Sequence, residues 1–225
     1  MRPRTHTQRV KQFASIALTA VVIMLAAIVA APTASASPES CYGQFCGEKA
    51  AAWARAHAED TPKYESDCTW FVSQALWFGG MPDTAKWTHT SMDDDNRGGS
   101  RARGDMAFWP TRTATIADEL KNYLVNDAGV ATITQLSWRN NNVFDAKLGD
   151  LIAYDWDLHD GKHSDGIIDH LAMVTGFSDE NPNYPLVSQH SPGQTNRGWT
   201  YSEGAGTWIE HDKPGASVYL IHFVD

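Results

Sequence analysis

The sequence predicts an α+β fold in which N-terminal helices pack on a mainly antiparallel, five-stranded sheet. Helix-like periodicity is found before Gly129, whereas short β-like runs separated by turn residues follow Val130. Helices followed by strands, without regular alternation of the two, are typical of α+β proteins rather than of parallel α/β sheets.

The N-terminus has the pattern of a secretory signal peptide. Four basic residues among the first 11 precede an uncharged run at 13–31 and an A-x-A sequence that ends at Ala36. This order predicts cleavage after Ala36, which leaves one domain over residues 37–225 of a secreted protein. The apolar run is also about as long as a short membrane span, so an uncleaved N-terminal membrane anchor is the alternative.

The mature chain is strongly acidic. Removing the four basic residues of the 1–36 leader changes the formal charge from −9 to −13 and leaves 189 residues, enough for one domain with its own core. A surface of this charge argues against nucleic acid and anionic lipid as partners. We expect no stable membrane insertion after signal cleavage.

Three cysteines in an oxidising compartment leave at least one thiol unpaired within the chain. Three pairings are conceivable. We favour a disulfide between Cys41 and Cys46, because this pair closes the smallest loop and lies in a polar segment near the mature N-terminus. This choice leaves Cys68 free.

Three helices are expected before Gly129. The alanine-rich 47–60 segment has helical spacing and is closed by Pro62, and a second apolar stripe begins at or beside Cys68 and stops at Gly79–Gly80. A third helix is expected over 113–129. The polar stretch 83–104 between the last two is predicted to be a long surface loop in a position to cover a site.

Five runs with strand character follow. Their hydrophobic, β-branched segments are bounded by glycine, proline and aspartate. They are expected at 149–156, 166–177, 185–191, 206–211 and 217–225.

Cys68 is the first candidate for chemistry. A thiol in the first turn of a helix lies near the positive end of the helix dipole and near backbone donors, which favour the thiolate. Ser66 or Asp67 could cap the same turn. On position alone, a buried structural cysteine is an equally good interpretation.

His170 is the candidate base. In "DHLAMVTG" strand alternation places His170 on one face with Ala172, whose small side chain leaves room for a packed helix. A histidine that faces a helix with a thiol at its N-terminus has the arrangement that a cysteine nucleophile requires. The polar "SQHS" run could supply the group that orients this base, from either Gln189 or His190, which point to opposite faces.

A metal site is the competing interpretation of the segment "DWDLHDGKHSDGIIDH" (155–170). Its histidines and carboxylates are suitable ligand types for zinc or calcium. The spacing matches neither H-E-x-x-H nor the calcium-loop offsets, so we favour a strand, a polar loop and a strand, with no metal and no other cofactor.

The nine tryptophans suggest a glycan-binding surface as a further alternative. Trp53 and Trp77 have core-like spacing on predicted helices, so they are expected to pack. Trp199 and Trp208, near glycine-rich turns, are the better candidates for contact with a ligand.

The motifs together resemble a known family. "DCTWFVSQALWFGGMP", "GDLIAYDW", "IDHLAMVTG" and "PLVSQHSP", in this order, are similar to the "Putative amidase domain" family of secreted bacterial proteins, a branch of the papain-like cysteine hydrolases related to the NlpC-type cell-wall peptidases. The resemblance covers nearly the whole mature chain. It implies a papain-like (NlpC-type) fold.

The resemblance also implies roles for individual residues. The nucleophile falls on Cys68, the general base on His170 and the third polar group on the "SQHS" strand, where we prefer His190 and hold Gln189 in reserve. Tyr64, Asp67 and Trp70 flank the thiol and are the candidate oxyanion or substrate residues. Trp70 departs from the family's usual D-C-T-N-F, which has asparagine at this position.

These roles imply a secreted amidase or peptidase that acts through a thiol acyl-enzyme. Its partner would be a peptide or amide substrate, with peptidoglycan stem peptides as the cell-wall candidate. Two alternatives stay open at the level of sequence. An acyltransferase would use the same Cys-His site with an amine or hydroxyl acceptor, and a catalytically silent cell-wall-binding module would keep the tryptophans without a reactive thiol.

Overall fold

The computed structural model describes residues 41–91, 109–137, 141–156, 164–202 and 205–224. The chain divides into two units, Met1–Ala36 and Ser37–Asp225, and the described residues all belong to the second. The predicted signal peptide, most of the predicted 83–104 loop and part of the acidic segment at 157–163 lie outside them. In the described part of the chain, no helix is long and apolar enough to span a bilayer.

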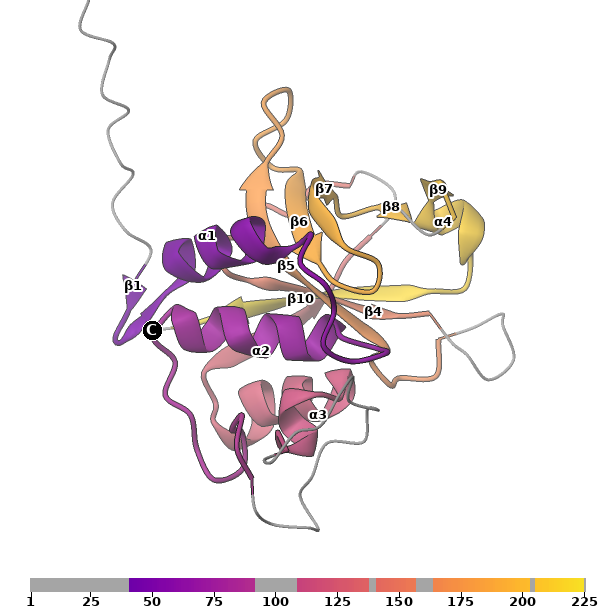
Figure 1. Cartoon of the computed structure of the whole chain (residues 1–225). Coiled ribbons are helices and arrows are strands. Elements are labelled where there is room, and N and C mark those ends of the chain that lie inside the picture. The colour runs from indigo at the N-terminus through magenta and orange to yellow at the C-terminus, as the bar shows by residue number, and fades with distance from the viewer. Residues whose placement is uncertain (1–40, 92–108, 138–140, 157–163, 203–204, 225) are drawn as a thin grey trace, which may run out of the picture. The chain divides into compact units, whose positions relative to one another are not determined.

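The described residues form an α+β structure, as predicted. A short hairpin and the helices come first, and the main strands follow (Figure 1). The N-terminal elements are β1 (Cys41–Tyr42), β2 (Phe45–Cys46), α1 (Gly47–His57), α2 (Cys68–Phe78), the 3-10 turn η2 (Arg112–Ala114), α3 (Ala117–Asn122) and the π-helical turn η3 (Tyr123–Asp127). The C-terminal elements are β3 (Ala131–Gln135), β4 (Leu151–Asp155), β5 (His170–Phe177), β6 (Pro185–Gln189), β7 (Gln194–Gly198), β8 (Tyr201–Ser202), β9 (Thr207–Trp208), α4 (Ile209–Asp212) and β10 (Ser217–Phe223).

The main sheet has six strands in the order β3-β10-β4-β5-β6-β7, and every neighbouring pair is antiparallel. The prediction of five strands was therefore wrong. It missed β3 and β7, the two edge strands, because both have largely exposed, polar side chains and pair through their backbones. It also placed a core strand at 206–211, where the structure has β9 and the short helix α4 outside the main sheet.

Two apolar clusters cover the two faces of this sheet. One joins α1, α2 and α3 to alternate residues of the central strands, including Leu151, Leu171 and Met173. The other packs Trp199 and Ile209 against the opposite face, which carries Ala172 and Val174. Figure 1 shows α1 and α2 side by side across the sheet, with α3 beside α2.

The helix that carries Cys68 begins and ends where its sequence predicts. Phe71, Val72, Ala75 and Leu76 are fully buried, which fixes the face that α2 turns to the sheet. Its last turn closes on Gly79, and Gly80 follows with a φ of 100°, a conformation that favours glycine. The N-terminus of α2 is thereby held at one position over the sheet.

The hairpin of β1 and β2 contains the disulfide. Cys41 and Cys46 are cross-strand partners and are joined by it, whereas Cys68 is a free, buried cysteine. Asp67 occupies the position before α2, but its carboxylate makes other contacts, described below, instead of capping the helix.

Candidate active site

Cys68 is the first residue of α2, and its side chain is 3% exposed. The thiol therefore lies at the positive end of the helix dipole, in a setting shielded from water. Burial makes a charged thiolate costly, so this position favours the thiolate only if a cation lies nearby to offset that cost.

His170 supplies that cation. Burial alone would raise the pKa of the Cys68 thiol, but the charge and hydrogen bonding of His170, together with hydrogen bonds from Thr69 and the Leu171 backbone, outweigh burial and lower the pKa to about 7. Burial likewise lowers the pKa of His170, but Cys68, the Gln189 side chain and the charge of Asp169 together outweigh burial, so that the net shift is upward. The two shifts are reciprocal, as expected for a thiol and an imidazole in hydrogen-bonding contact.

Two further groups that contact the thiol were not identified from the sequence. Thr69 Oγ1 lies 3.6 Å from Cys68 Sγ, and the backbone N–H of Leu171 hydrogen bonds to the thiol; both lower the pKa of Cys68. The "CT" pair in the sequence could have indicated Thr69. A backbone donor such as that of Leu171 leaves no signal in residue identities.

The position of His170 follows from β5, of which it is the first residue. Its alternation was predicted correctly, but the helices pack on the Leu171 and Met173 face, and Ala172 belongs to the opposite cluster. The expected role of Ala172 was therefore wrong. The imidazole meets Cys68 at the end of the strand, and Tyr154 and Trp156 lie beside it with ring centroids 5.7 and 5.4 Å away.

The structure separates the two candidates for the third group. The Gln189 side chain raises the pKa of His170, although its amide nitrogen donates to the Pro192 carbonyl at 3.5 Å. Among the described residues, His170 Nε2 is buried without a partner at hydrogen-bonding geometry. We therefore regard Gln189 and His170 as being in close polar contact without a well-formed hydrogen bond.

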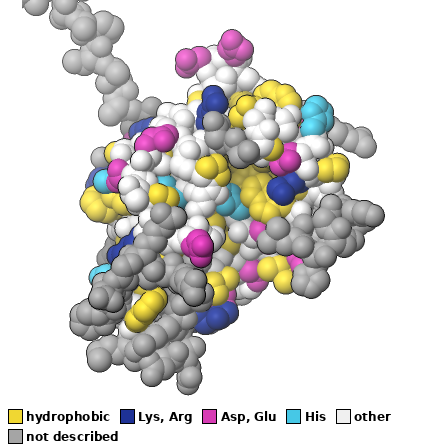
Figure 2. Space-filling view, turned by 45° about the vertical axis from the view of Figure 1, so that its right-hand side comes forward, with side chains coloured by type: hydrophobic (Ala, Val, Ile, Leu, Met, Phe, Trp, Pro, Cys, Tyr) yellow, Lys and Arg dark blue, Asp and Glu magenta, His cyan; other side chains and the backbone are white. Residues whose placement is uncertain are grey.

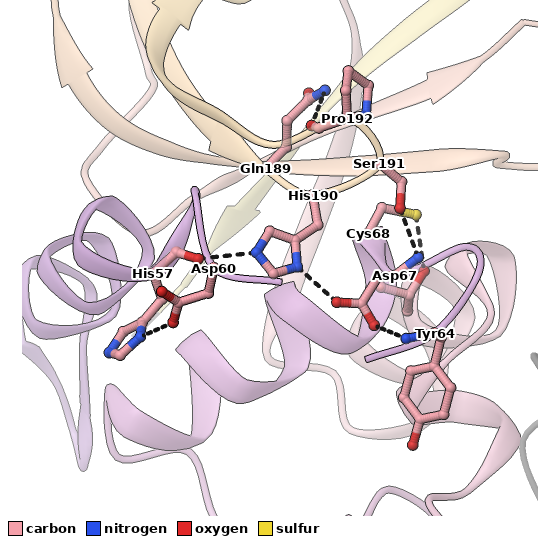
Figure 3. Close-up of polar contacts among 10 residues, drawn as sticks. His57, Asp60, Tyr64, Asp67, Cys68, Gln189, His190, Ser191 and Pro192 are labelled. Atoms are coloured by element: carbon pink, nitrogen blue, oxygen red, sulfur yellow. Dashed lines mark hydrogen bonds and ion pairs between the residues drawn. The ribbon is translucent and has the colours of Figure 1, made fainter. Parts of the chain in front are cut away.

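His190 points elsewhere. Its Nδ1 lies 2.6 Å from Asp67 Oδ2 and its Nε2 lies 2.9 Å from the carbonyl of His57, with its ring stacked on Phe71 at 4.4 Å (Figure 3). Both ring nitrogens are thus directed away from His170. The preference for His190 as the orienting group does not fit this geometry, because His190, which follows the last residue of β6, bonds to Asp67 and the His57 carbonyl, whereas the Gln189 side chain acts on His170.

Tyr64 and Trp70 lie on the flank of α2 away from the Cys68–His170 pair. Tyr64 is buried edge-to-face against Trp70, and its ring extends away from Cys68 in Figure 3. Burial and the charge of Asp67 raise the pKa of its hydroxyl well above the usual range. Trp70 lines a separate aromatic pocket with Trp53 and Trp77 and is not among the residues that line the Cys68 pocket.

Cys68 and His170 line two different pockets. Cys68 and Thr69 line one of about 840 Å³ together with Ile116 and Asp169. His170 and Gln189 line the other, of about 380 Å³, whose walls include Tyr154, Trp156, Ser191, Tyr201 and Lys213. On the face that α4 occupies, Figure 2 shows hydrophobic side chains beside basic, acidic and histidine side chains. Because Cys68 and His170 contact each other, each pocket has one of these two residues in its wall.

In the described part of the acidic segment 155–170, carboxylates accept hydrogen bonds from backbone N–H groups. Asp155 accepts the backbone N–H groups of Asp165 and Gly166 at 3.1 and 2.9 Å, and Asp169 accepts that of Trp156 at 2.9 Å. Within the described ranges, no group of three or more metal-ligating side chains comes together. His159, Asp160 and His163 lie outside those ranges.

Only one of the two tryptophans expected at a ligand surface is exposed. Trp199 is 1% exposed and donates its indole N–H to the Asn141 carbonyl at 3.0 Å, so the expectation for it was wrong. Its position near a turn concealed its role in the core beneath the sheet. Trp208 is 46% exposed and lies edge-to-face on Tyr201.

Comparison with known proteins gives one match. The family model described as "Putative amidase domain" matches residues 44–211, a span that contains Cys68, His170 and Gln189. No curated protein and no solved structure matches the chain. Because the matched residues make up well over half of the sequence, the chain belongs to the "Putative amidase domain" family.

Proposed function

We propose that this protein is a cysteine hydrolase that cleaves an amide bond through a thioester acyl-enzyme. The observation that carries the proposal is the buried Cys68 thiol at the start of α2, whose pKa is lowered to about 7 despite burial, chiefly by His170. Membership of an amidase family is consistent with such a reaction. The mainly antiparallel α+β structure, with a cysteine at a helix start and a histidine on the adjoining sheet, supports a papain-like (NlpC-type) relationship.

The reaction follows from the two side chains. His170 takes the thiol proton, and Cys68 Sγ bonds to the carbonyl carbon of the substrate. The carbon–nitrogen bond then breaks as His170 returns the proton to the leaving amine. Water next attacks the thioester, His170 takes its proton and gives it to the departing thiolate, and a carboxylic acid leaves. Gln189 is the group best placed to orient His170.

The oxyanion would form at the N-terminus of α2. The backbone N–H of Cys68 lies at the start of the helix, where donors are directed outward. The backbone N–H of Asp67 is bonded to Ser191 Oγ at 2.9 Å and is therefore unsuitable as a second donor.

We propose export through the 1–36 leader and a peptide substrate, with cell-wall stem peptides as the candidate class. The charged groups in the Cys68 pocket support an amine-bearing substrate, because Glu65 and Asp169 line this pocket.

Alkylation kinetics with peptide mapping test the mechanism. Iodoacetamide should label Cys68 with a rate that rises through about pH 7, and Cys68→Ala should abolish both labelling and amide hydrolysis of wall fragments. Cys68→Ser is the matched control, since it keeps the size and a weak nucleophile. Full hydrolysis by Cys68→Ala, or a thiol that reacts only above pH 9, would contradict the proposal.

A further inference from the structure

Three consecutive residues, the last of β6 and the two that follow it, contact His170 and Asp67. Gln189 contacts His170. His190 and Ser191 both bind Asp67, the residue before Cys68 (Figure 3). Ser191 has a φ of 60°, an uncommon value for a residue other than glycine, and its Oγ accepts the Asp67 N–H at 2.9 Å. Residues 189–191 therefore hold the end of β6, which carries Gln189, against the start of α2, which carries Cys68.

The geometry defines the protonation of His190. The His57 carbonyl can only accept, so His190 Nε2, 2.9 Å away, must carry a proton. Asp67 Oδ2 lies 2.6 Å from Nδ1, a distance typical of a charge-assisted bond, and Asp67 Oδ1 already accepts the Tyr64 N–H at 2.9 Å. Two donating nitrogens make His190 an imidazolium paired with the Asp67 carboxylate.

The surroundings of His190 favour the cation. Burial lowers the pKa of His190, but the bonds to Asp67 and the His57 carbonyl and the charges of Asp67 and Asp60 outweigh burial and raise it. On the α1 side, Asp60 also bonds to the His57 ring at 2.7 Å. On the α2 side, the Phe71 ring stacks on the imidazole and presents no charge.

Asp67 would otherwise oppose the nucleophile. Its carboxylate is completely buried and is attached to the residue that precedes Cys68. A buried negative charge on the residue next to a thiol, if left without a counter-charge, would disfavour the thiolate. A cation on Asp67 removes this repulsion and leaves the helix terminus and His170 to act on Cys68.

We propose that His190 is a positioning residue for the nucleophile: as the cationic partner of Asp67, it neutralises the carboxylate beside Cys68 and holds the first turn of α2. This inference rests on the proposed role of Cys68. The two candidates in the "SQHS" run then have separate roles. Gln189 orients His170, and His190 pairs with Asp67 at the start of the helix that carries Cys68.

A double-mutant cycle read by ultraviolet titration of the thiolate tests the inference. The chains to compare are the wild type, His190→Gln, Asp67→Asn and Asp67→Asn/His190→Gln, with Cys68→Ser as the absorbance blank. His190→Gln should reduce the thiolate-to-thiol ratio at neutral pH about tenfold, equivalent to about one pKa unit. The double variant, which lacks both charges, should recover most of this loss.

The cycle separates an electrostatic role from a merely structural one. If His190 only stabilises the fold, the double variant will be less stable and its thiol will not recover. A His190→Gln thiol that titrates like the wild type, or a double variant that stays shifted, overturns the inference. The wild-type value tests the proposed function instead, because an ordinary thiol pKa would contradict a nucleophilic Cys68, whatever the variants do.

A measurement on the unmodified protein covers the case in which His190→Gln does not fold. Nitrogen NMR of the imidazoles should show both ring nitrogens of His190 protonated at neutral pH. An unprotonated Nδ1 or Nε2 at that pH would overturn the inference without any variant.

Discussion

His170 and His190 lie on or beside neighbouring strands, are both buried next to the start of α2, and both have a raised pKa, yet their surroundings differ. Both nitrogens of His190 are engaged, by a carboxylate and a carbonyl. His170 contacts a thiol and has a ring nitrogen without a well-formed hydrogen bond among the described residues. A histidine that must exchange protons needs such freedom, whereas a fully bonded one serves as a fixed charge.

Replacing the base should have the largest effect on activity. His170→Ala removes both the proton acceptor and the cation that offsets burial of the thiolate, so we expect a loss of amide hydrolysis of about 10³-fold, the range of general-base catalysis. Alkylation of Cys68 at pH 7 should fall in parallel. His170→Gln is the matched control of similar size. A loss for His170→Ala no larger than that for His190→Gln would remove the contrast between the two histidines.

Removing the partner of His190 should chiefly affect stability. Asp67→Ala leaves a buried cation without its carboxylate, and losses of about 3–5 kcal/mol are typical when one partner of a buried pair is deleted. Denaturant unfolding would measure the change. Asp60→Ala, which removes the 62% exposed carboxylate near the same histidine, is the control and should change little. Equal losses in the two variants would contradict the assigned pairing.

Gln189 should contribute a smaller amount through His170. Gln189→Ala removes one polar contact, so we expect the catalytic rate to fall about tenfold, near the upper range of a single hydrogen bond. Thr195→Ala, on the neighbouring strand β7, is the control. A Gln189→Ala enzyme with full activity would show that the close contact with His170 does not orient the base.

The stability contributed by His190 should depend on pH with a definite sign. The pKa of His190 is raised in the folded state, so its contribution is fully present below the unfolded value of about 6.5 and is lost as pH rises through the raised value. The gap in unfolding free energy between the wild type and His190→Gln should therefore narrow from pH 6 toward alkaline pH. A gap that widens with pH would show that His190 is buried as the neutral form. His211→Gln, at an exposed histidine, is the control.

Trp70 should matter least to the thiol, even though it stands where the family pattern has asparagine. Its ring lines the aromatic pocket on the other flank of α2 and packs against Tyr64 and Trp77. Trp70→Phe should therefore lower the unfolding free energy by about 1–3 kcal/mol through lost packing and leave the titration of Cys68 unchanged. A shift in the thiol pKa would show that this flank reaches the site.

The elements with strong local patterns could be predicted from the sequence. The apolar stripe after Cys68 and its glycine stop define α2, and alternation identifies the strand that carries His170, predicted over 166–177 and observed as β5. Edge strands could not be predicted in this way, because the polar residues of β3 and β7 pair through backbone groups that every sequence has. For the same reason the Leu171 N–H on the thiol was missed.

The sequence by itself determined the class of the fold, the cysteine at a helix start and the small set of polar residues from which a site could be assembled. Spacing and periodicity carry this information, because they act along the chain. Only the tertiary structure decided which face of β5 meets the helices and that Gln189 turns to His170 while His190 turns to Asp67. Those choices depend on contacts between residues more than 100 positions apart, whose energies no local pattern contains.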